Sequence, residues 1–490
     1  MTMTFADLLS LAPLLIVTAT AVVAMLLVGI HRNYAATAMV SIAGLFIATI
    51  AAAMMIEGTN EQITPLLIID QYSLFFTVVV CAAAMFIAIY SYSYFLNLDD
   101  DREEFYLLLV VATIGAIVMV SSNHFVSTIL GLETLSMALY GMVAYPLHSK
   151  ESAKYPLEAS VKYLVLSAVA SGLILFGMAL IYAQTGTMAF TSVTNLVAPS
   201  TEGLSDNYTI IALLLISAGM AFKLSLAPFH IWTPDVYEGA PLPATAFLAT
   251  IGKTGMFVVL LRYVEISNAL EFSSVVTVFS FIAILSILAG NLLALLQDNL
   301  KRILAYSSVA HMGYLLIAII ASYFAVGTIS IEAVTFYLLA YVIMSLGAFG
   351  VATVASSSEN ELDSINDYQG LFWRNPWIAT VFTGMLLSLA GIPLTVGFIG
   401  KFYIFLAGVE SSLFALLIVL VLGSGIGLYY YLRIVYRMLL PVDDSVSASN
   451  TSSHIFGSYV VLAILFLLLI VLGVYPARIM TIIETISAFI

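Results

Sequence analysis

Long apolar runs recur along the whole chain, and each can cross a lipid bilayer as one helix. A hydrocarbon core needs about 20 apolar residues per helix, and about fourteen runs meet that length. They lie near residues 8–30, 34–56, 73–96, 105–122, 124–145, 159–184, 208–232, 241–264, 273–297, 300–323, 330–355, 376–407, 412–440 and 456–486. The 490-residue chain is 62% hydrophobic and 9% charged, unlike a soluble domain. The sequence therefore predicts an all-α polytopic membrane protein with about 14 transmembrane helices.

Basic residues are unevenly distributed between the two sides of this predicted bundle. Only Arg262 and Arg478 follow even-numbered helices. Nine follow odd-numbered helices: Arg32, Arg102, Lys150, Lys154, Lys301, Arg302, Arg374, Arg433 and Arg437. Because Lys and Arg concentrate in cytoplasmic loops, we expect the odd loops in the cytoplasm. With an even number of helices, both termini are then expected in the periplasm.

Net charge and cysteine content exclude several functions. The net charge of −13 argues against nucleic acid as a partner. The single cysteine, Cys81, lies in an apolar run, which excludes a disulfide framework and an iron–sulfur cluster ligated by this chain alone. Neither a dinucleotide fingerprint after a strand nor a paired-histidine haem pattern stands out. We therefore expect no redox centre, bound cofactor or metal in this chain.

Four short segments recur in the same order at offsets of 163 to 174 residues. The pairs are EASVKYL at 158–164 with EAVTFYL at 332–338, FG at 176–177 with 349–350, LSLAP at 224–228 with LSLA at 387–390, and LRYV at 261–264 with LRIV at 432–435. They indicate two related five-helix units, helices 4–8 and 9–13. Because five is odd, the two copies enter the membrane from opposite sides, as inverted repeats do.

The repeats divide the chain into four predicted parts. We expect a three-helix N-terminal segment at 1–104, a first inverted repeat at 105–265, a second at 266–440 and a C-terminal helix at 441–490. The first apolar run lacks a basic flank and a cleavage site, so we expect a retained helix rather than a signal peptide.

The stretch from Phe222 to Lys253 holds two lysines, a histidine and four prolines within the predicted membrane region. Proline removes a backbone hydrogen bond, and in a membrane such a break is tolerated only inside protein or beside water. We expect helix 7 to break at Pro228 and helix 12 to break between Gly391 and Pro393. Charge beside a broken helix at membrane depth indicates an ion pathway.

Candidate site residues follow from charge within the spans. Glu133, Lys223, Lys253 and Lys401 lie inside apolar runs. A lysine facing lipid at the helix centre costs about 2.5–3.5 kcal/mol, so these residues must face protein or water. Glu133 and a lysine could form a static ion pair between helices, or a titrating pair that loads and releases a proton. The positions of Lys223 and Lys401 beside the two breaks favour the titrating pair.

Three further residues are possible relays. Lys162 could instead pair with Glu158, one turn away. His230 follows the predicted break and could satisfy freed backbone groups rather than carry a proton. His311 lies among Ser307, Ser308 and Tyr314 in the sequence. We expect Lys253 and Lys401 to lack a carboxylate partner in this chain, and polar groups near His311 to link them to Lys223.

Two other groups are expected to have structural roles only. Asp235 and Glu238 are predicted to lie in a solvated loop after the break of helix 7. The tyrosines at 429–431 are predicted to pack in the core or to lie in the aromatic belt at the membrane surface.

Longer motifs connect the chain to a known family. They are FKLSLAPFHIWTPDVYEGAP at 222–241, GLETLSM at 131–137, NLKRILAYSSVAHMGYLL at 299–316, LSLAGIPLTVGFIGKF at 387–402 and LYYYLR at 428–433. With these motifs the whole chain resembles the antiporter-like membrane subunits of respiratory complex I, the proton-translocating NADH:quinone oxidoreductase. One sister subunit has a glutamate in place of Lys401, and another has a long lateral helix after its core. Since this chain has Lys401 and ends at Ile490, the resemblance favours the third such subunit.

The resemblance implies a role for each candidate residue. Glu133 and Lys223 would form the pair of the first half-channel, Lys253 would connect the halves, and Lys401 would serve the second half-channel. It also implies a bacterial inner membrane, other complex I membrane subunits and lipids as partners, and NADH, FMN, iron–sulfur clusters and quinone held by partner subunits. Cation/proton antiporter subunits share this fold and are the alternative; the WTPDVYEGAP and LYYYLR motifs favour complex I.

Overall fold

The structure is a computed structural model that describes residues 5–56, 61–96, 98, 102–145, 154–191, 203–324, 328–358, 361–441 and 456–489. Within these residues, eleven helices are long and apolar enough to cross a membrane, and three shorter apolar helices accompany them. This agrees with the predicted total of about fourteen. Lys150, most of the loop at 97–101 and the start of the predicted segment at 441–490 lie outside the described residues.

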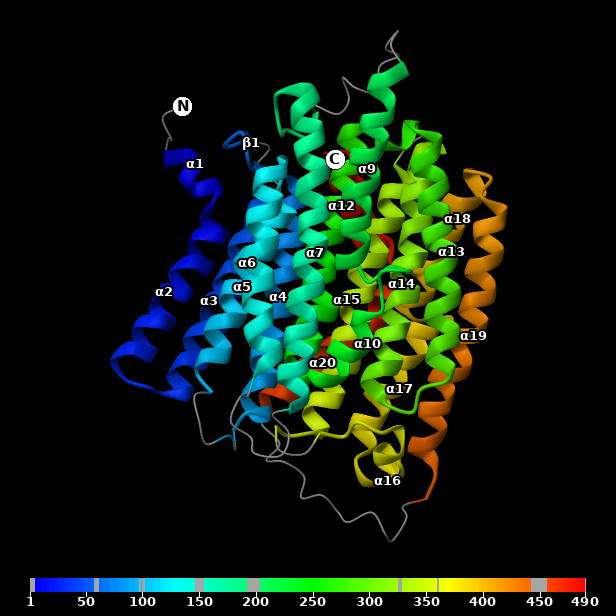
Figure 1. The fold of residues 1–490 in the computed structure, drawn as a ribbon. Helices are drawn as coiled ribbons and strands as arrows, with labels where there is room; N and C mark the ends of the chain where they lie inside the picture. The colour runs from blue at the N-terminus through cyan, green and yellow to red at the C-terminus, as the bar shows by residue number, and fades with distance from the viewer. Residues whose placement is uncertain are drawn as a thin grey trace.

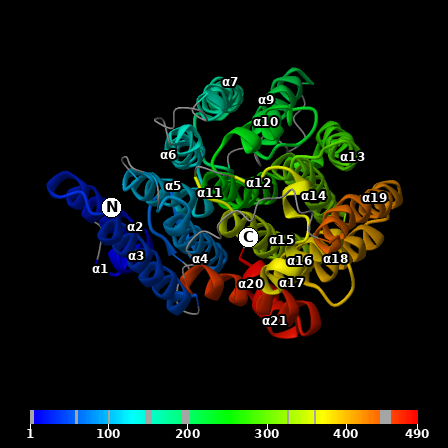
Figure 2. The same cartoon turned by 90° about the horizontal axis from the view of Figure 1, so that it is seen from below.

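The N-terminal segment forms one edge of the bundle (Figure 2). It contains helices α1 (Phe5–Ser10), α2 (Ala12–Ile30), α3 (Tyr34–Met55) and α4 (Gln71–Tyr94), with a short antiparallel hairpin of β1 (Glu61–Gln62) and β2 (Ile68–Ile69) before α4. Asp70 and Ser73 form a capping box that starts α4. Most of α4 is buried, whereas α2 and α3 expose large apolar side chains, as expected where helices face lipid.

Helices of the first repeat follow in the order predicted. They are α5 (Glu104–Val120), α6 (Phe125–Ala144), α7 (Lys154–Thr185), α9 (Gly203–Lys223), α10 (Trp232–Gly239), α11 (Leu242–Phe247), the π-helix η1 (Leu248–Gly252) and α12 (Lys253–Ser267). Helix 8 of the prediction is therefore one span made of α11, η1 and α12. A π-helical turn lies directly before Lys253, a feature often found at functional sites.

The second repeat is preceded by the 3₁₀ turn η2 (Ala269–Glu271). It contains α13 (Ser273–Leu295), α14 (Leu300–Phe324), α15 (Ile329–Ala355), η3 (Ile365–Tyr368), α16 (Leu371–Arg374), α17 (Pro376–Ala390), α18 (Val396–Glu410) and α19 (Phe414–Leu439). The chain then forms α20 (Phe456–Val474) and α21 (Ala477–Ser487), so the predicted single C-terminal helix is interrupted at Tyr475 and Pro476.

Corresponding helices of the two repeats make corresponding contacts. Helix α5 packs on α6 as α13 packs on α14, α7 packs on α9 as α15 packs on α17, and α12 packs on α5 as α19 packs on α13. This pairing supports the duplication inferred from the sequence. Helices α14 and α15 and the α11–α12 span lie in the middle of the bundle and are the most buried (Figures 1 and 2).

Both predicted helix breaks are confirmed. Helix α9 ends at Lys223 and the chain becomes helical again at Trp232, with Pro228 inside the break. Helices α17 and α18 are separated by the segment from Gly391 to Thr395. Side chains bind the backbone groups that a break frees: the Ala227 N–H donates to Ser286 Oγ at 2.8 Å, and the Gly397 N–H to Ser388 Oγ at 3.0 Å.

Arg262 is a correction to the predicted loops. It lies inside α12 rather than after it, its side chain is 2% exposed, and its guanidinium pairs with the Asp70 carboxylate at 2.9 Å. The pair joins the N-terminal segment to the first repeat in the interior. The sequence could not indicate this burial because the partner lies 192 residues away.

Candidate functional site

Lys223 is the last residue of α9, at the start of the first break. Its side chain is buried, and its ammonium donates to Ser136 Oγ on α6 at 3.1 Å and to Ser167 Oγ on α7 at 2.5 Å. Tyr140 donates its own hydroxyl to the same Ser167 at 2.8 Å. The ammonium is therefore held between three helices by neutral hydroxyl groups.

Glu133 lies on α6, about one helical turn before Ser136, which binds Lys223. Its carboxylate accepts a hydrogen bond from Ser171 Oγ at 2.6 Å. Glu133 is three residues from Ser136 on α6, and Ser171 is four residues from Ser167 on α7. The Glu133–Ser171 site is therefore about one helical turn away from the two serines that bind Lys223. Although both residues are described, Glu133 and Lys223 do not form an ion pair; serine hydroxyls lie around each charge.

Lys253 begins α12, directly after the π-helical turn. It is 1% exposed, and its ammonium donates to Ser308 Oγ on α14. The Ser308 hydroxyl is 2.8 Å from the Tyr341 hydroxyl on α15, which donates to the Ala249 carbonyl of the π-helix at 3.1 Å. Tyr341 thus connects the ligand of Lys253 to the irregular turn that precedes Lys253.

His311 lies in the centre of α14 and is surrounded by tyrosines. Its Nδ1 is 2.6 Å from the Tyr337 hydroxyl and its Nε2 is 3.3 Å from the Tyr431 hydroxyl. Tyr431 also bonds Ser307, one turn before His311. The imidazole packs on the Tyr341 ring with 5.6 Å between centroids, so it lies beside the Lys253 ligands.

Lys401 lies on α18, just after the second break. Its ammonium donates to the Leu389 and Ala390 carbonyls at 3.0 and 2.9 Å and to Ser424 Oγ on α19 at 2.8 Å. The two carbonyls belong to the last turn of α17, where the helix dipole favours a cation. The ammonium also lies 5.2 Å from the ring centroid of Tyr314.

Polar side chains connect Lys253 to Lys401 through α14. The sequence of contacts is Lys253, Ser308, Tyr341, His311, Tyr314 and Lys401. The first two steps are hydrogen bonds, and the last three are ring contacts, of which the final one is the approach of the Lys401 ammonium to the Tyr314 ring. A second branch runs from Tyr314 through Asn291 to Tyr430. Among the residues described, no hydrogen bond connects the Lys223 cluster to Lys253.

We call Lys223, Lys253 and Lys401, with their hydroxyl and carbonyl ligands and His311, the polar axis. Lys162 lies outside this axis. Its side chain is 44% exposed and pairs with Glu158 at 2.9 Å and with Asp235 at 3.1 Å. Arg302 bonds the same Asp235 at 3.0 Å. Burial by itself raises the pKa of the Asp235 carboxyl, but the hydrogen bonds from Arg302 and Lys162 outweigh it and hold this pKa below its usual value.

Asp235 and Glu238 correct the predicted loop but not its solvation, since their side chains are 40% and 43% exposed. Both lie on α10, and Glu238 pairs with Arg302 at 2.7 Å. His230 precedes α10 and lies beside the Tyr306 ring, with 6.3 Å between centroids. The buried Nδ1 of His230 has no hydrogen-bond partner in the described part of the chain. The structure therefore does not connect Lys162 or His230 to the polar axis by a hydrogen bond.

Several ligands of the axis were missed or misjudged from the sequence. Ser136, Ser167 and Ser424 bind lysine ammonium groups although nothing in their local sequence indicates it. Tyr430 and Tyr431 are buried and hydrogen-bonded, so the predicted surface belt applies only to Tyr429, which is 65% exposed.

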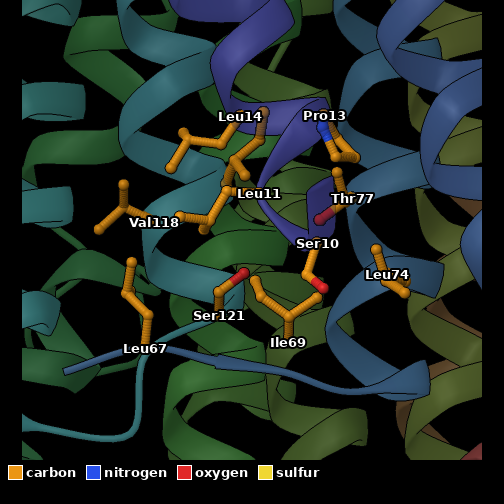
Figure 3. Close-up of a pocket in the computed structure, with 11 residues that line it drawn as sticks. Ser10, Leu11, Pro13, Leu14, Leu67, Ile69, Leu74, Thr77, Val118 and Ser121 are labelled. Atoms are coloured by element: carbon orange, nitrogen blue, oxygen red, sulfur yellow. The ribbon is translucent and has the colours of Figure 1, made fainter. Parts of the chain in front are cut away.

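No group of three or more potential metal ligands occurs among the described residues, and Cys81 is a buried free thiol. An apolar pocket lies between α1, α2, β2, α4 and α5, and neither the buried lysines nor their ligands line it (Figure 3). Its lining includes the hydroxyls of Ser10, Thr77 and Ser121 but no charged side chain. None of the titratable candidate residues therefore lines this pocket.

Comparison with known proteins places this geometry in a family. Residues 122–427 match the family model described as NADH:quinone oxidoreductase/Mrp antiporter, transmembrane. A protein of Methylococcus capsulatus named NADH-quinone oxidoreductase subunit N is 44% identical over 90% of this chain and 88% of its own. The protein of the same name from Acinetobacter baumannii is 44% identical over 97% of this chain and 95% of its own.

Solved structures agree with these relatives. A chain of respiratory complex I from Thermus thermophilus with bound aureothin is 29% identical, with a TM-score of 0.80 over 96% of this chain and 98% of that one. A chain of the Mrp complex from Dietzia sp. is 19% identical, with a TM-score of 0.84 over 98% and 97%, and shows the fold alone. The chain therefore belongs to the NADH:quinone oxidoreductase/Mrp antiporter transmembrane family and, within it, to the subunit N proteins of NADH-quinone oxidoreductase.

Proposed function

We propose that protons cross this membrane subunit of NADH-quinone oxidoreductase through Glu133, Lys223, Lys253, His311 and Lys401. The chain is a proton-translocating multi-pass membrane protein, and other membrane subunits of the complex are its partners. In this proposal Glu133 and Lys223 load the first half, Lys253 and His311 pass the proton between the repeats, and Lys401 serves the second half.

One observation carries the proposal: the three buried lysines of the axis have neutral ligands. Among the described residues, Lys223, Lys253 and Lys401 bind hydroxyls and backbone carbonyls and form no ion pair with a carboxylate. A lysine with neutral ligands can lose its proton without leaving a partner carboxylate uncompensated in the interior. By contrast, the buried Arg262 is paired with Asp70, as expected of a permanent charge.

Sidedness and cofactors are further parts of the proposal. The distribution of basic residues supports a bacterial inner membrane orientation with both termini in the periplasm. NADH, FMN, iron–sulfur clusters and quinone are assigned to partner subunits, with no redox centre in this chain, because the sequence offers no cysteine cluster.

Lipids would cover the exposed apolar faces of α2 and α3. Lys162 and His230 are left outside the proposed proton path, since among the described residues no hydrogen bond joins either of them to the axis.

Replacing Lys253 by Met tests the proposal. The variant keeps the bulk of the side chain and removes the titrating group, so assembled complex in vesicles should lose proton-coupled quinone reduction. Lys162→Met is the matched control, because it also removes a lysine but from an exposed ion pair. Normal coupled activity of assembled Lys253→Met would overturn the assignment.

A further inference from the structure

A second titratable cluster lies at the end of the bundle where α11 and α14 begin. Lys301 on α14 forms an ion pair with Glu361, and its Nζ lies 3.4 Å from Oδ1 of Asp363. Glu361 also accepts from the Tyr94 hydroxyl and from the Leu242 N–H at 2.9 Å. The side chains become more exposed in one direction, from 2% for Lys301 to 16% for Glu361 and 44% for Asp363. The cluster thus reaches from the interior to the surface.

The cluster is aligned with the ligand of Lys253. Lys301 and Ser308 are seven residues apart on α14 and share one face, so they are separated by about 10 Å along the helix. The Lys253 ammonium donates to this Ser308, so it binds α14 about two helical turns from Lys301.

A buried phenol lies between the two sites. Tyr237 is fully buried on α10, and its ring centroid is 5.7 Å from the Lys253 ammonium. At the end of α10, about one turn after Tyr237, the Ala240 carbonyl accepts a hydrogen bond of 3.1 Å from the Lys301 ammonium. The Tyr237 hydroxyl forms no hydrogen bond of ordinary geometry among the described residues, although it interacts at longer range with the Ser308 hydroxyl that binds Lys253. Since buried hydroxyls in proteins almost always bond protein or water, this group indicates a place for water between Lys301 and Lys253.

We propose that Asp363, Glu361 and Tyr237 form a proton-uptake route that delivers protons from one membrane surface to Lys253. The route rests on the function proposed above and adds an entry point to it. By the distribution of basic residues, the loop that holds Asp363 follows an odd-numbered helix and faces the cytoplasm.

Each step of this route moves one proton between groups that can carry it. A proton from bulk water binds the Asp363 or Glu361 carboxylate, and the resulting acid releases it through water and hydroxyls to the neutral amine of Lys253, which becomes an ammonium. Only O–H and N–H bonds break and form, and Lys301 keeps its charge throughout. Burial raises the pKa of the Asp363 carboxyl above its usual value, although Lys301 opposes this shift, so the acid form is favoured there.

A purely structural role for the cluster makes different predictions. Glu361 joins α4, α11 and α14, so it could act only as a brace at the start of the Lys253 span. Glu361→Gln separates the two roles, because the amide keeps an acceptor for Tyr94 and Leu242 but cannot take up a proton. Tyr237→Phe removes a hydroxyl that forms no hydrogen bond of ordinary geometry in the described structure.

The experiment measures NADH:quinone reduction by complex reconstituted in vesicles, in H₂O and in D₂O. For Glu361→Gln we expect coupled turnover to fall on the order of ten-fold or more and the solvent isotope effect to rise, since a positioned acid or base contributes about 10²- to 10⁴-fold. Glu361→Asp should restore part of the rate. Tyr237→Phe should raise the isotope effect, whereas Tyr263→Phe, which also removes a buried hydroxyl without a partner in the described residues, should not.

The outcomes separate this route from the proposed function. If Glu361→Gln fails to assemble, Tyr237→Phe still decides, and a normal rate and isotope effect in that variant would overturn the route. If Lys253→Met abolishes coupled turnover while assembled Glu361→Gln and Tyr237→Phe match wild type, the route is wrong and the proton pathway stands. If Lys253→Met is also normal, the proposed function itself fails.

Discussion

Gly400 is the position at which one methyl group tests whether the His311 contacts matter. A Cβ added there would lie 2.5 Å from Cδ2 of Tyr337, where ordinary contacts are about 3.5–4.0 Å. The Tyr337 ring must therefore move by about 1 Å. Its hydroxyl is 2.6 Å from His311 Nδ1, and a displacement of about 1 Å away from the imidazole exceeds the range of a hydrogen bond.

Gly400→Ala should therefore lower coupled turnover without removing any titratable group. A misplacement of about 1 Å can cost on the order of 10²-fold in rate, so we expect a loss of about 10- to 100-fold. Stability should fall by about 1–3 kcal/mol if the buried imidazole nitrogen loses its partner. Proton translocation and quinone reduction are measured on purified, assembled complex in vesicles.

The control is Gly425→Ala on α19, where an added Cβ meets nothing within 4 Å. It should leave activity unchanged. Tyr337→Phe removes the hydroxyl without crowding and should reproduce the functional loss. Normal coupled activity of assembled Gly400→Ala and Tyr337→Phe would refute the participation of this contact in proton transfer.

Three further predictions address the first half-channel, the interior ion pair and the sidedness. Lys223→Met should abolish coupled quinone reduction, and Glu133→Asp should be milder than Glu133→Ala because a charge remains; equal activity of these variants and wild type in vesicle assays would contradict the assignment. Arg262→Met should destabilise the purified complex by about 3–5 kcal/mol in thermal unfolding, and adding Asp70→Asn should recover much of the loss, because the damage comes from an uncompensated buried carboxylate. A cysteine in place of Asp298, whose side chain is 78% exposed, should react only with reagents admitted to the cytoplasm; labelling from outside intact cells would reverse the orientation.

The sequence predicted the features of this fold that local chemistry determines. Proline at 228 and glycine at 391 act on their own backbone, so both helix breaks could be placed from the sequence. Lysines within apolar runs are visible for the same reason, since their cost in lipid requires a protein or water environment. The apolar runs predicted the number of spans and the repeated segments predicted two related five-helix units, and corresponding helices of these units pack alike in the structure.

Ligands contributed by distant helices could not be predicted in the same way. Ser167 binds Lys223 from 56 residues away, and serine is common enough in membrane helices that no local pattern distinguishes a ligand. Tyr429 and Tyr431 have similar neighbours in sequence, but one is exposed and the other bonds His311, because helix rotation decides which side chain faces the axis. The π-helical turn before Lys253 also has no recognised sequence signal.

Proton translocation by complex that carries Lys401→Met shows whether Lys401 passes a proton. The measurement is the number of protons moved per NADH oxidised, together with the amount of assembled complex. If Lys401 passes a proton, the variant should assemble normally and coupled translocation should collapse, because the Lys401 ammonium is bound only by neutral groups among the described residues. Normal translocation by the assembled variant, or a loss explained entirely by failed assembly, would contradict proton transfer through Lys401 and favour a structural role for it.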